Sequence, residues 1–401
     1  MADTAAGRPL EGVVVLDLSR ILAGPYASQK LGDMGATVWK VELPGQGDDT
    51  RAWGPPFHEG ISTYFMAVNR SKRSLTLDLK HQDGKRVLGR LIERADVVLE
   101  NFRAGLLEKL GFGWERIQAL NPRAVYASIS GYGQVGRHSD RPSFDVIAQG
   151  EWGPQDLTGD PAGPPTKFGL SIADITAGQH AVEGILLALL QRARTGRGQR
   201  VDVALSDGLL ALLTYQAQMV LTGGVAPRRL GNAHPSIVPY QTFATRDGWI
   251  NVGVGNEGLW AKFCAAAEHP ELHADPRYAT NRDRVERREE LIATLEETFR
   301  ARDTAEWLER LTAAGIPVGP IRDVPTALED ARTDLRGMVT TVQHPEAGPL
   351  TMVGNAVKLS EVGMDPAYLP PPRLGEHTDE ILAAAGYGPE EVASLRERGV
   401  V

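Results

Sequence analysis

Short apolar runs alternate with helical patterns through the first half of the chain. The runs are continuously apolar, which is typical of strands in a parallel sheet that helices cover on both faces. Helical patterns, such as those over 26–34 and 85–94, fall between the runs. This alternation predicts an α/β fold with a doubly wound parallel sheet, whose sites lie at the carboxyl ends of the strands. The predicted strands are 13–18, 36–42, 75–79, 96–100, 124–130 and 199–205.

The most regular helical pattern lies directly after Asp174 and ends at Gly196. We therefore expect Asp174 at or near the N-cap, where free N–H groups and the helix dipole keep a carboxylate ionised. Asp174 is then either a simple cap or a nucleophile held where a loop meets a helix. The expected apolar stripe of this helix is Val182, Ile185, Leu186, Leu189 and Leu190.

The pattern changes in the second half of the chain. Residues 206–221 predict a long apolar helix. A hairpin is predicted over 241–254, because Asp247-Gly248 separates two strands. Charged helices follow it. The pattern divides the chain near 205–225 and again near 325–350.

Composition narrows the possible functions. With 401 residues we expect two or three domains, and 42% hydrophobic with 23% charged residues is ordinary for a globular protein. The net charge of −8 argues against a nucleic-acid partner. No apolar run reaches the ~18 residues of a membrane span. The single cysteine, Cys264, excludes an intrachain disulfide, so we expect a cytoplasmic protein without a membrane partner.

The first two predicted strands, with Glu42 ending the second, are laid out as in dinucleotide-binding folds. The loop between them holds only Gly24 in place of the glycine fingerprint, so NAD binding is disfavoured. A basic turn over 70–73 precedes the third strand. This turn is either solvated or binds nucleotide phosphates, which arginine can hold with a forked pair of donors.

Five short segments, taken in order along the chain, indicate a family. They are Leu16-Asp-Leu-Ser-Arg20 with Ala23-Gly24-Pro25, Gly35-Ala36 before Lys40-Val-Glu42, Asn69 to Ser74, Glu100-Asn101-Phe102, and Ser171-Ile-Ala-Asp174 with Thr195-Gly-Arg-Gly-Gln199. Together they resemble the family III CoA-transferases, which include formyl-CoA and carnitine CoA-transferases and the α-methylacyl-CoA racemases. The resemblance covers nearly the whole chain. It is closest to the succinate–hydroxymethylglutarate CoA-transferase branch, through 47–56 and 233–241.

The resemblance implies a Rossmann-like large domain formed by both chain ends, a smaller α+β middle domain, and a homodimer of two interlocked rings. On this basis the large domain comprises 1–205 and 350–401, and the small domain comprises 229–325. A linker helix over 206–228 and a second linker over 326–349 would connect them.

By the same resemblance, Asp174 attacks the thioester of an acyl-CoA and forms an aspartyl–acyl anhydride. An aspartyl–CoA thioester follows and passes CoA to an acceptor acid. Dividing the transfer into covalent steps is the usual gain of nucleophilic catalysis. The implied donor is succinyl-CoA or a similar dicarboxylyl-CoA, and the acceptor is a small carboxylic acid. CoA is a substrate here, and no metal or permanently bound cofactor is expected.

The resemblance also implies two groups of site residues. Those expected to bind CoA are Lys72, Arg73, Ser74, Asn101, Phe102 and Lys109. Those expected around the acyl and acceptor groups are Arg20, Leu22, Arg51, Tyr132, Phe144, Asp145, Trp152 and His234. A dicarboxylate needs a cation for its distal carboxylate, and Arg20, Arg51 and Arg141 are the candidates. His234 either bonds to the backbone of its own loop or helps to bind the acceptor.

Several residues depart from the patterns of the relatives. Phe144 stands where racemases have a histidine, which disfavours racemisation, and Leu22 stands where formyl-CoA enzymes have a glutamine, which disfavours an oxalate-type acceptor. Trp152, followed by Pro154-Gln155, replaces small and apolar residues near the acyl site. The loop 231–238 lacks the glycine run of a mobile lid. The alternatives are an acyl-CoA racemase or epimerase on the same fold, and a CoA-binding protein with weakened transferase activity.

Overall fold

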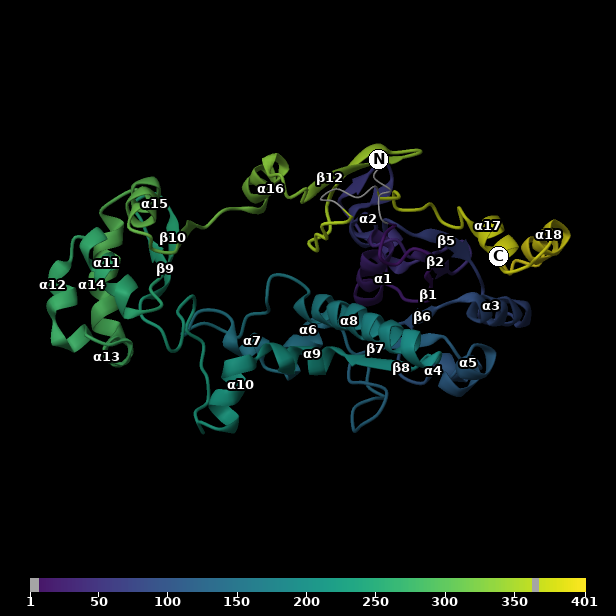
Figure 1. The fold of residues 1–401 in the computed structure, drawn as a ribbon, viewed down its shortest axis with the longest axis horizontal. Helices are drawn as coiled ribbons and strands as arrows, with labels where there is room; N and C mark the ends of the chain where they lie inside the picture. The colour runs from purple at the N-terminus through teal and green to yellow at the C-terminus, as the bar shows by residue number, and fades with distance from the viewer. Residues whose placement is uncertain (1–6, 363–367) are drawn as a thin grey trace. The chain divides into compact units, whose positions relative to one another are not determined.

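A six-stranded parallel sheet forms the centre of the larger of two units (Figure 1). The computed structural model describes residues 7–362 and 368–401. The strand order, β5-β2-β1-β6-β7-β8, is the 3-2-1-4-5-6 order of dinucleotide-binding folds, with its reversal between β1 and β6. The predicted mixed α/β fold and its parallel sheet are confirmed. The strands are β1 (Val14–Asp17), β2 (Thr37–Glu42), β5 (Arg73–Thr76), β6 (Val97–Glu100), β7 (Val125–Ser130) and β8 (Arg200–Ala204).

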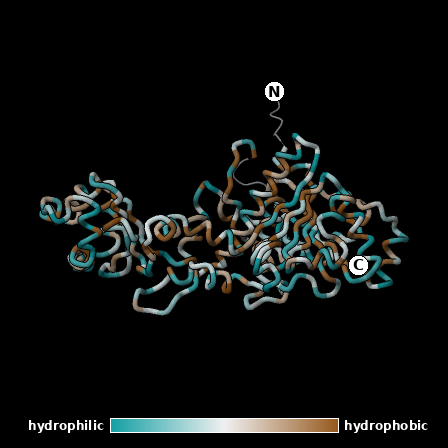
Figure 2. Tube along the Cα trace, turned by 90° about the horizontal axis from the view of Figure 1, so that it is seen from below, coloured by the Kyte–Doolittle hydropathy of each residue, from teal (hydrophilic) through white to brown (hydrophobic). Residues whose placement is uncertain are grey.

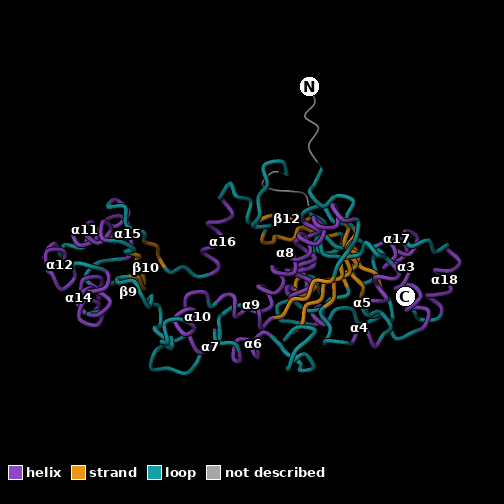
Figure 3. Tube along the Cα trace, turned by 60° about the horizontal axis from the view of Figure 1, so that its bottom comes forward, coloured by secondary structure: helices purple, strands orange, loops and turns teal. Residues whose placement is uncertain are grey.

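Helices cover both faces of this sheet (Figure 3). Successive side chains of a strand point to opposite faces, so Leu16 packs into one core and Val15 into the other. Figure 2 shows short hydrophobic segments alternating with hydrophilic ones along the chain. One face carries α3 (Gln82–Arg94), α5 (Trp114–Leu120), α17 (Thr378–Ala384) and α18 (Pro389–Glu397). The other carries α1 (Ala23–Asp33), α6 (Asp145–Glu151), α8 (Ile172–Thr195) and α9 (Leu205–Leu212).

The long helix α8 is present as expected, but a different face of it is buried. Its buried residues are small, and a Cβ added at Gly178 would lie 2.7 Å from the carbonyl oxygen of Ala23 in α1. Small side chains allow the backbones of α1 and α8 to approach closely, whereas Leu186 and Leu190 are exposed. The predicted apolar stripe was therefore wrong in part. The buried stripe includes Ala173, Ala177, Ala181, Ile185 and Ala188.

The small unit comprises Gln155–Lys167 and Gly224–Glu329 and has its own core. The predicted hairpin is present as β9 (Tyr240–Ala244) and β10 (Trp249–Gly253), and β11 (Val318–Pro320) pairs with β10. Cys264 is buried in this core, as its apolar neighbours indicate. The helices are α11 (Glu257–Ala266), α12 (Pro270–Ala274), α13 (Asn281–Glu286), α14 (Arg288–Arg300) and α15 (Thr304–Ala313), with the short helix η2 (Pro276–Tyr278).

The boundaries of the two units differ from the expected ones. Residues 155–167, expected in the large domain, cluster with the small unit, where the Arg229 guanidinium donates to the backbone and the carboxylate of Asp156 at 2.9 Å. The expected linker helix over 206–228 is two helices, α9 and α10 (Thr214–Leu221).

The expected second linker contains regular structure as well. It holds most of α16 (Val324–Thr333) and a hairpin of β12 (Val339–His344) and β13 (Gly348–Val353), which packs on Met66 of the large unit. Hence the large unit resumes at Asp330, ahead of the expected boundary at 350.

Short elements complete the description. They are η1 (Asp49–Ala52), β3 (Phe57–His58), β4 (Ile61–Ser62), α2 (Thr63–Asn69), α4 (Leu106–Lys109) and α7 (Pro154–Leu157). Among the helices in the described residues, none is long and apolar enough to cross a membrane.

Candidate active site

Asp174 lies in the first turn of α8, where the helix begins after Ser171. The free N–H groups of this turn do not bind its own carboxylate. Instead they point to Asp145, whose Oδ1 accepts hydrogen bonds from the N–H of Ala173 (2.8 Å) and of Asp174 (3.4 Å). Asp145 is the first residue of α6, so one helix supplies the cap of the other. The prediction that Asp174 lies near the helix N-terminus is confirmed, but Asp145 caps the helix.

Gln149 holds Asp145 in this position. Its Nε2 donates to Asp145 Oδ2 at 2.7 Å, and its Oε1 accepts from the N–H of Phe168 at 2.7 Å. Gln149 is completely buried. The segment that leads into α8 is therefore fixed to α6 by buried polar contacts.

The charge state of Asp174 differs from the expected one. Burial, followed by the nearby negative charge of Asp145, raises the pKa of the Asp174 carboxyl to about 7. Within the described residues this carboxylate accepts no hydrogen bond and forms no ion pair, although it is half-buried. The expected stabilisation by free N–H groups is absent, because Asp145 already takes them. Asp174 is thus a poorly solvated carboxylate without a partner.

Tyr64 in α2 is affected by the same charges, and no sequence pattern pointed to it. Burial and the charges of Asp174, Asp145 and Asp48 raise the pKa of the Tyr64 phenol to about 12. Its ring packs edge-on against Trp53 at a centroid distance of 5.1 Å. The phenol therefore stays protonated and available as a donor at neutral pH.

A cavity of about 300 Å³ opens at the carboxyl ends of β1, β2 and β5. Its position at the strand ends, beside the reversal of the strand order, is where this type of sheet binds nucleotides. Arg20 and Lys80 supply positive charge to its lining. The apolar lining residues are Leu18, Val41, Leu43, Leu77, Leu79, Phe102, Leu106 and Leu110.

The segment Arg20–Leu22 leads into α1, and its first residue, Arg20, lines this cavity. Its position is fixed from β6 by Asn101, whose side chain accepts from the N–H of Arg20 (2.8 Å) and donates to the carbonyl of Arg20 (2.7 Å). Asn101 therefore acts here through protein backbone. Phe102, next to it, lines the cavity, and the Arg20 guanidinium lies 6.0 Å from the centre of its ring.

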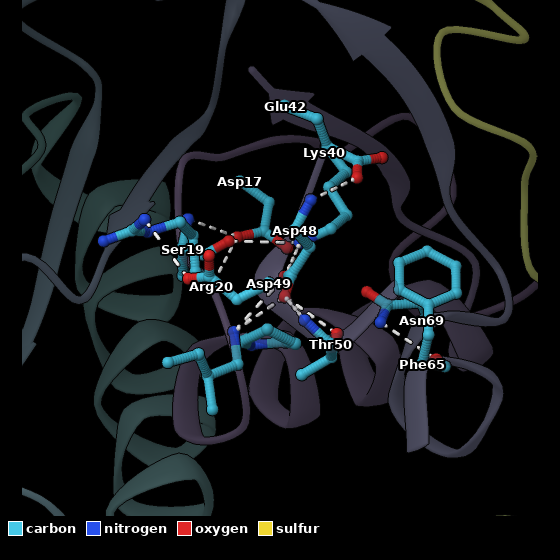
Figure 4. Close-up of polar contacts among 12 residues, drawn as sticks. Asp17, Ser19, Arg20, Lys40, Glu42, Asp48, Asp49, Thr50, Phe65 and Asn69 are labelled. Atoms are coloured by element: carbon cyan, nitrogen blue, oxygen red, sulfur yellow. Dashed lines mark hydrogen bonds and ion pairs between the residues drawn. The ribbon is translucent and has the colours of Figure 1, made fainter. Parts of the chain in front are cut away.

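Asp48 holds the same segment from the other side (Figure 4). Its buried carboxylate accepts from Lys40 Nζ (2.8 Å) and from the N–H of Ile21 (3.2 and 3.3 Å). Ile21 has φ of 71°, a left-handed conformation that is unfavourable for a β-branched residue and costs about 1–3 kcal/mol. Thr50 also donates to Asp48, through its N–H (3.0 Å) and its hydroxyl (2.7 Å).

Two residues expected to bind CoA lie inside the protein instead. Lys72 has a completely buried side chain, and its Nζ donates to the Pro25 carbonyl and to Asn69 Oδ1, both at 2.9 Å. The Ser74 hydroxyl is also buried and donates to Glu42 Oε1 at 2.7 Å. The basic turn is therefore neither fully solvated nor free for phosphates. The buried carboxylates of Asp17 and Glu42, which the sequence pattern hides, draw these side chains inward.

Two other basic residues expected to bind CoA remain at the surface. Arg73 is partly exposed and pairs with Glu380 at 3.0 Å. Lys109 is exposed at the end of α4.

The three arginines considered for a distal carboxylate have different surroundings. Arg51 forms a two-pronged ion pair with the buried Glu42, at 2.7 Å for each contact. Arg141 pairs with Glu151. Arg20 is the most exposed of the three, with 53% of its side chain accessible, and it pairs with Asp49 only at 3.3 Å. Of the three, Arg20 has the weakest competition for its charge.

Four further residues were expected around the acyl and acceptor groups. Tyr132 and Trp152 lie together, with ring centres 6.4 Å apart, and the Tyr132 hydroxyl donates to Glu151 at 2.7 Å. Leu22 is buried at the start of α1, whereas Phe144 is exposed before α6.

His234 belongs to the small unit and bonds to the backbone of its own loop. Its Nδ1 accepts from the N–H of Ser236 at 3.1 Å, and its carbonyl accepts from Arg288. The backbone alternative for His234 thus has direct support. In the part of the chain that is described, no cluster of His, Cys, Asp or Glu side chains could hold a metal ion.

The strand order of the parallel sheet and a cavity at the carboxyl ends of its strands are features of nucleotide-binding α/β folds. The chain belongs to CoA-transferase family III, whose family model matches residues 10–378. It is 43% identical to a succinyl-CoA:glutarate CoA-transferase of Mus musculus, over 95% of this chain and 87% of that protein. It is 40% identical to a succinate–glutarate CoA-transferase of Agrobacterium fabrum, over 94% and 95%. The crystal structure of a CaiB/BaiF family protein from Brucella suis superimposes with a TM-score of 0.83 at 41% identity, covering 95% of this chain and all of that chain. The protein is therefore a family III CoA-transferase.

The raised pKa of Asp174 makes a prediction for stability. The folded carboxyl holds its proton up to about pH 7, whereas the unfolded one loses it near 3.8, so the native state loses stability as pH rises between these values. Asp174→Asn removes this loss. We expect the variant to be more stable than the native protein by about 1–3 kcal/mol at pH 8, and the difference to shrink towards pH 4.

Denaturant unfolding at several pH values would measure this difference, with Asp140→Asn as a control at an exposed carboxylate. A difference that stays constant between pH 4 and pH 8 would contradict the assignment.

Proposed function

We propose that the protein transfers CoA from succinyl-CoA, or a similar dicarboxylyl-CoA, to an acceptor carboxylic acid, with Asp174 as the nucleophile. The observation that carries this proposal is the half-buried Asp174 carboxylate, which has no hydrogen-bond partner within the described residues and a pKa raised to about 7. A carboxylate without donors keeps its electron pairs available, and the raised pKa makes it more basic than an ordinary aspartate. The names of the relatives support succinyl-CoA as donor and dicarboxylates as acceptors.

The transfer then proceeds in four balanced steps. The Asp174 carboxylate attacks the donor thioester carbonyl, which forms a mixed anhydride and releases CoA thiolate. The thiolate attacks the aspartyl carbonyl, which gives an aspartyl–CoA thioester and frees the donor acid with one oxygen from Asp174. The acceptor carboxylate attacks this thioester and expels the thiolate again. The thiolate finally attacks the acceptor carbonyl, which yields the new acyl-CoA and restores Asp174.

Asp145 and Tyr64 have distinct roles in this proposal. Asp145 keeps the N–H groups of α8 away from Asp174, and its charge disfavours a second negative charge nearby. Covalent acylation removes the charge of Asp174, so Asp145 favours the acylated state over the free carboxylate. The protonated Tyr64 can donate to an oxyanion or to the substrate carboxylate.

The cavity at the strand ends is the proposed site for the nucleotide part of CoA. Its apolar walls suit an adenine ring, while Arg20 and Lys80 are close enough to its interior to meet phosphates. Arg73 and Lys109 remain candidates for phosphate contacts at the surface. Lys72 and Ser74 are left out of the proposed CoA contacts because both are buried and engaged.

We also infer that the protein is a homodimer of interlocked chains. Helix α10 has no buried residue, and large apolar side chains on α8, α9 and α10 face solvent in the single chain. A concentration of exposed large apolar side chains on neighbouring helices supports an interface there. These exposed side chains are Leu186, Leu187, Leu190, Leu210, Leu212, Tyr215, Val220 and Leu221.

Transfer of CoA between two carboxylic acids can be tested directly. Incubation with succinyl-CoA and glutarate should yield glutaryl-CoA, and Asp174→Ala should lower turnover at least about 1,000-fold, because the covalent route is lost. Mass spectrometry of the CoA esters measures both, with Asp140→Asn as a control for a lost surface charge. Transfer by Asp174→Ala at the native rate would remove Asp174 as the nucleophile. A panel of other mono- and dicarboxylates identifies the acceptor class.

The proposed dimer interface can be tested by placing charges on α8. Leu187 and Leu190 are 59% and 55% exposed on α8 in the single chain. The double change Leu187→Glu with Leu190→Glu would place two charges in the interface, so we expect light scattering to detect monomer or poorly folded protein where the native protein is a dimer. Leu335→Glu, at a leucine that is 93% exposed outside these helices, should leave the dimer intact. A folded, fully dimeric double variant would contradict this interface.

A further inference from the structure

The bend between β1 and α1 contains a strained non-glycine residue, Ile21, next to Arg20, which lines the cavity. Ile21 has φ of 71°, in the left-handed region that favours glycine. Its neighbours in the chain are already constrained: the Asn101 side chain binds both backbone polar groups of Arg20, and Leu22 is the N-cap of α1. Such strain persists only when the surroundings hold it in place.

Asp48 stabilises the left-handed conformation of Ile21. Both of its carboxylate oxygens accept from the N–H of Ile21, at 3.2 and 3.3 Å. The carboxylate is itself immobilised, because it is completely buried and accepts from Lys40 Nζ at 2.8 Å and from Thr50 at 2.7 Å. Its backbone N–H donates to the buried Glu42 at 2.9 Å. Figure 4 shows Asp48 at the centre of these contacts, between β2 and the bend.

The bend is coupled to Asp174 through close packing. Ala23, two residues after Ile21, presents its carbonyl to Gly178, where an added Cβ would lie only 2.7 Å away. Gly178 is one turn beyond Asp174 in α8. A change in the conformation of Ile21 would therefore shift the start of α1 against the turn that carries the nucleophile. It would also move Arg20 at the rim of the cavity.

We propose that Asp48 is a positioning residue for catalysis: it holds Ile21 in its left-handed conformation and thereby sets Arg20 and the start of α1 relative to Asp174. This inference rests on the proposed function for its catalytic part. In this proposal Asp48 supports the bend through Ile21 and does not contact the reacting atoms. Misplacement of reacting groups by about 1 Å can lower a rate about 100-fold.

A double-mutant cycle between Asp48 and Ile21 tests the proposal. Asp48→Asn should lower kcat about 10- to 100-fold, since the weaker amide acceptor no longer holds the strained bend. In the Ile21→Gly background the same change should cost at most about threefold, because glycine adopts positive φ without support. The coupling should also appear in the unfolding midpoint, with a smaller decrease from Asp48→Asn in the glycine background. A role in stability alone, through the ion pair with Lys40, would give equal losses in both backgrounds and would overturn the proposal.

Asp33→Asn is the matched control. Asp33 is an equally buried carboxylate in a two-pronged ion pair with Arg70, at the opposite end of α1. It should lower the unfolding midpoint but leave kcat within about threefold of the native value. If Asp33→Asn lowers kcat as much as Asp48→Asn does, general destabilisation explains the effect and the proposal fails.

A second pair of variants covers the case in which Asp48→Asn does not fold. Ile21→Pro keeps the buried ion pair but fixes φ near −65° and removes the N–H. It should lower kcat at least about 100-fold, whereas Ile21→Ala, which keeps the N–H, should stay within about fivefold. Native turnover by Ile21→Pro would overturn the proposal. If the native enzyme itself transfers no CoA, the proposed function fails, and the coupling in the unfolding midpoint still decides whether Asp48 holds Ile21.

Discussion

Four buried charges at the carboxyl ends of the first strands hold the site together. Asp17, Lys40, Asp48 and Lys72 have completely buried side chains, and they form two ion pairs, Lys40–Asp48 at 2.8 Å and Lys72–Asp17 at 3.4 Å. Removing one member of such a pair costs about 3–5 kcal/mol, because its partner stays buried and uncompensated. Any rearrangement of the loop after β2 or the bend before α1 would break one of these contacts. The pairs therefore fix the loops whose shape creates the cavity.

The surroundings of Asp174, the proposed nucleophile, are different. The buried side chains of Lys40 and Lys72 are paired with carboxylates, whereas the Asp174 carboxylate has no donor among the described residues and lies near the charge of Asp145. A helix start ordinarily lowers the pKa of an acid in its first turn. Here Asp145 takes the N–H groups of that turn, and burial together with the negative charge of Asp145 raises the pKa of the Asp174 carboxyl.

The sequence predicted the parallel sheet well, because continuous apolar runs reflect a local requirement of buried strands. It predicted the buried face of α8 poorly. Leu186 and Leu190 looked like core residues, but the close approach of α1 selects the alanines, and that approach is a tertiary feature. Lys72 looked like a phosphate ligand for a similar reason: its partner Asp17 lies 55 residues away in the sequence. The helical pattern placed Asp174 at a helix start and the family resemblance implied its role, whereas Tyr64 and the cap formed by Asp145 became visible only in three dimensions.

The most direct test of the central claim follows the oxygen atoms of the Asp174 carboxylate. The enzyme is allowed to turn over succinyl-CoA with an acceptor whose carboxylate carries oxygen-18. The protein is then digested, and the mass of the peptide that contains Asp174 is measured by mass spectrometry. If Asp174 is the covalent nucleophile, the last step of each cycle leaves an acceptor oxygen on it, so the peptide gains oxygen-18. Asp145, in the neighbouring helix, should gain none. Full turnover with an unlabelled Asp174 would show that CoA moves between the acids without an aspartyl anhydride, and the account of this site would be wrong.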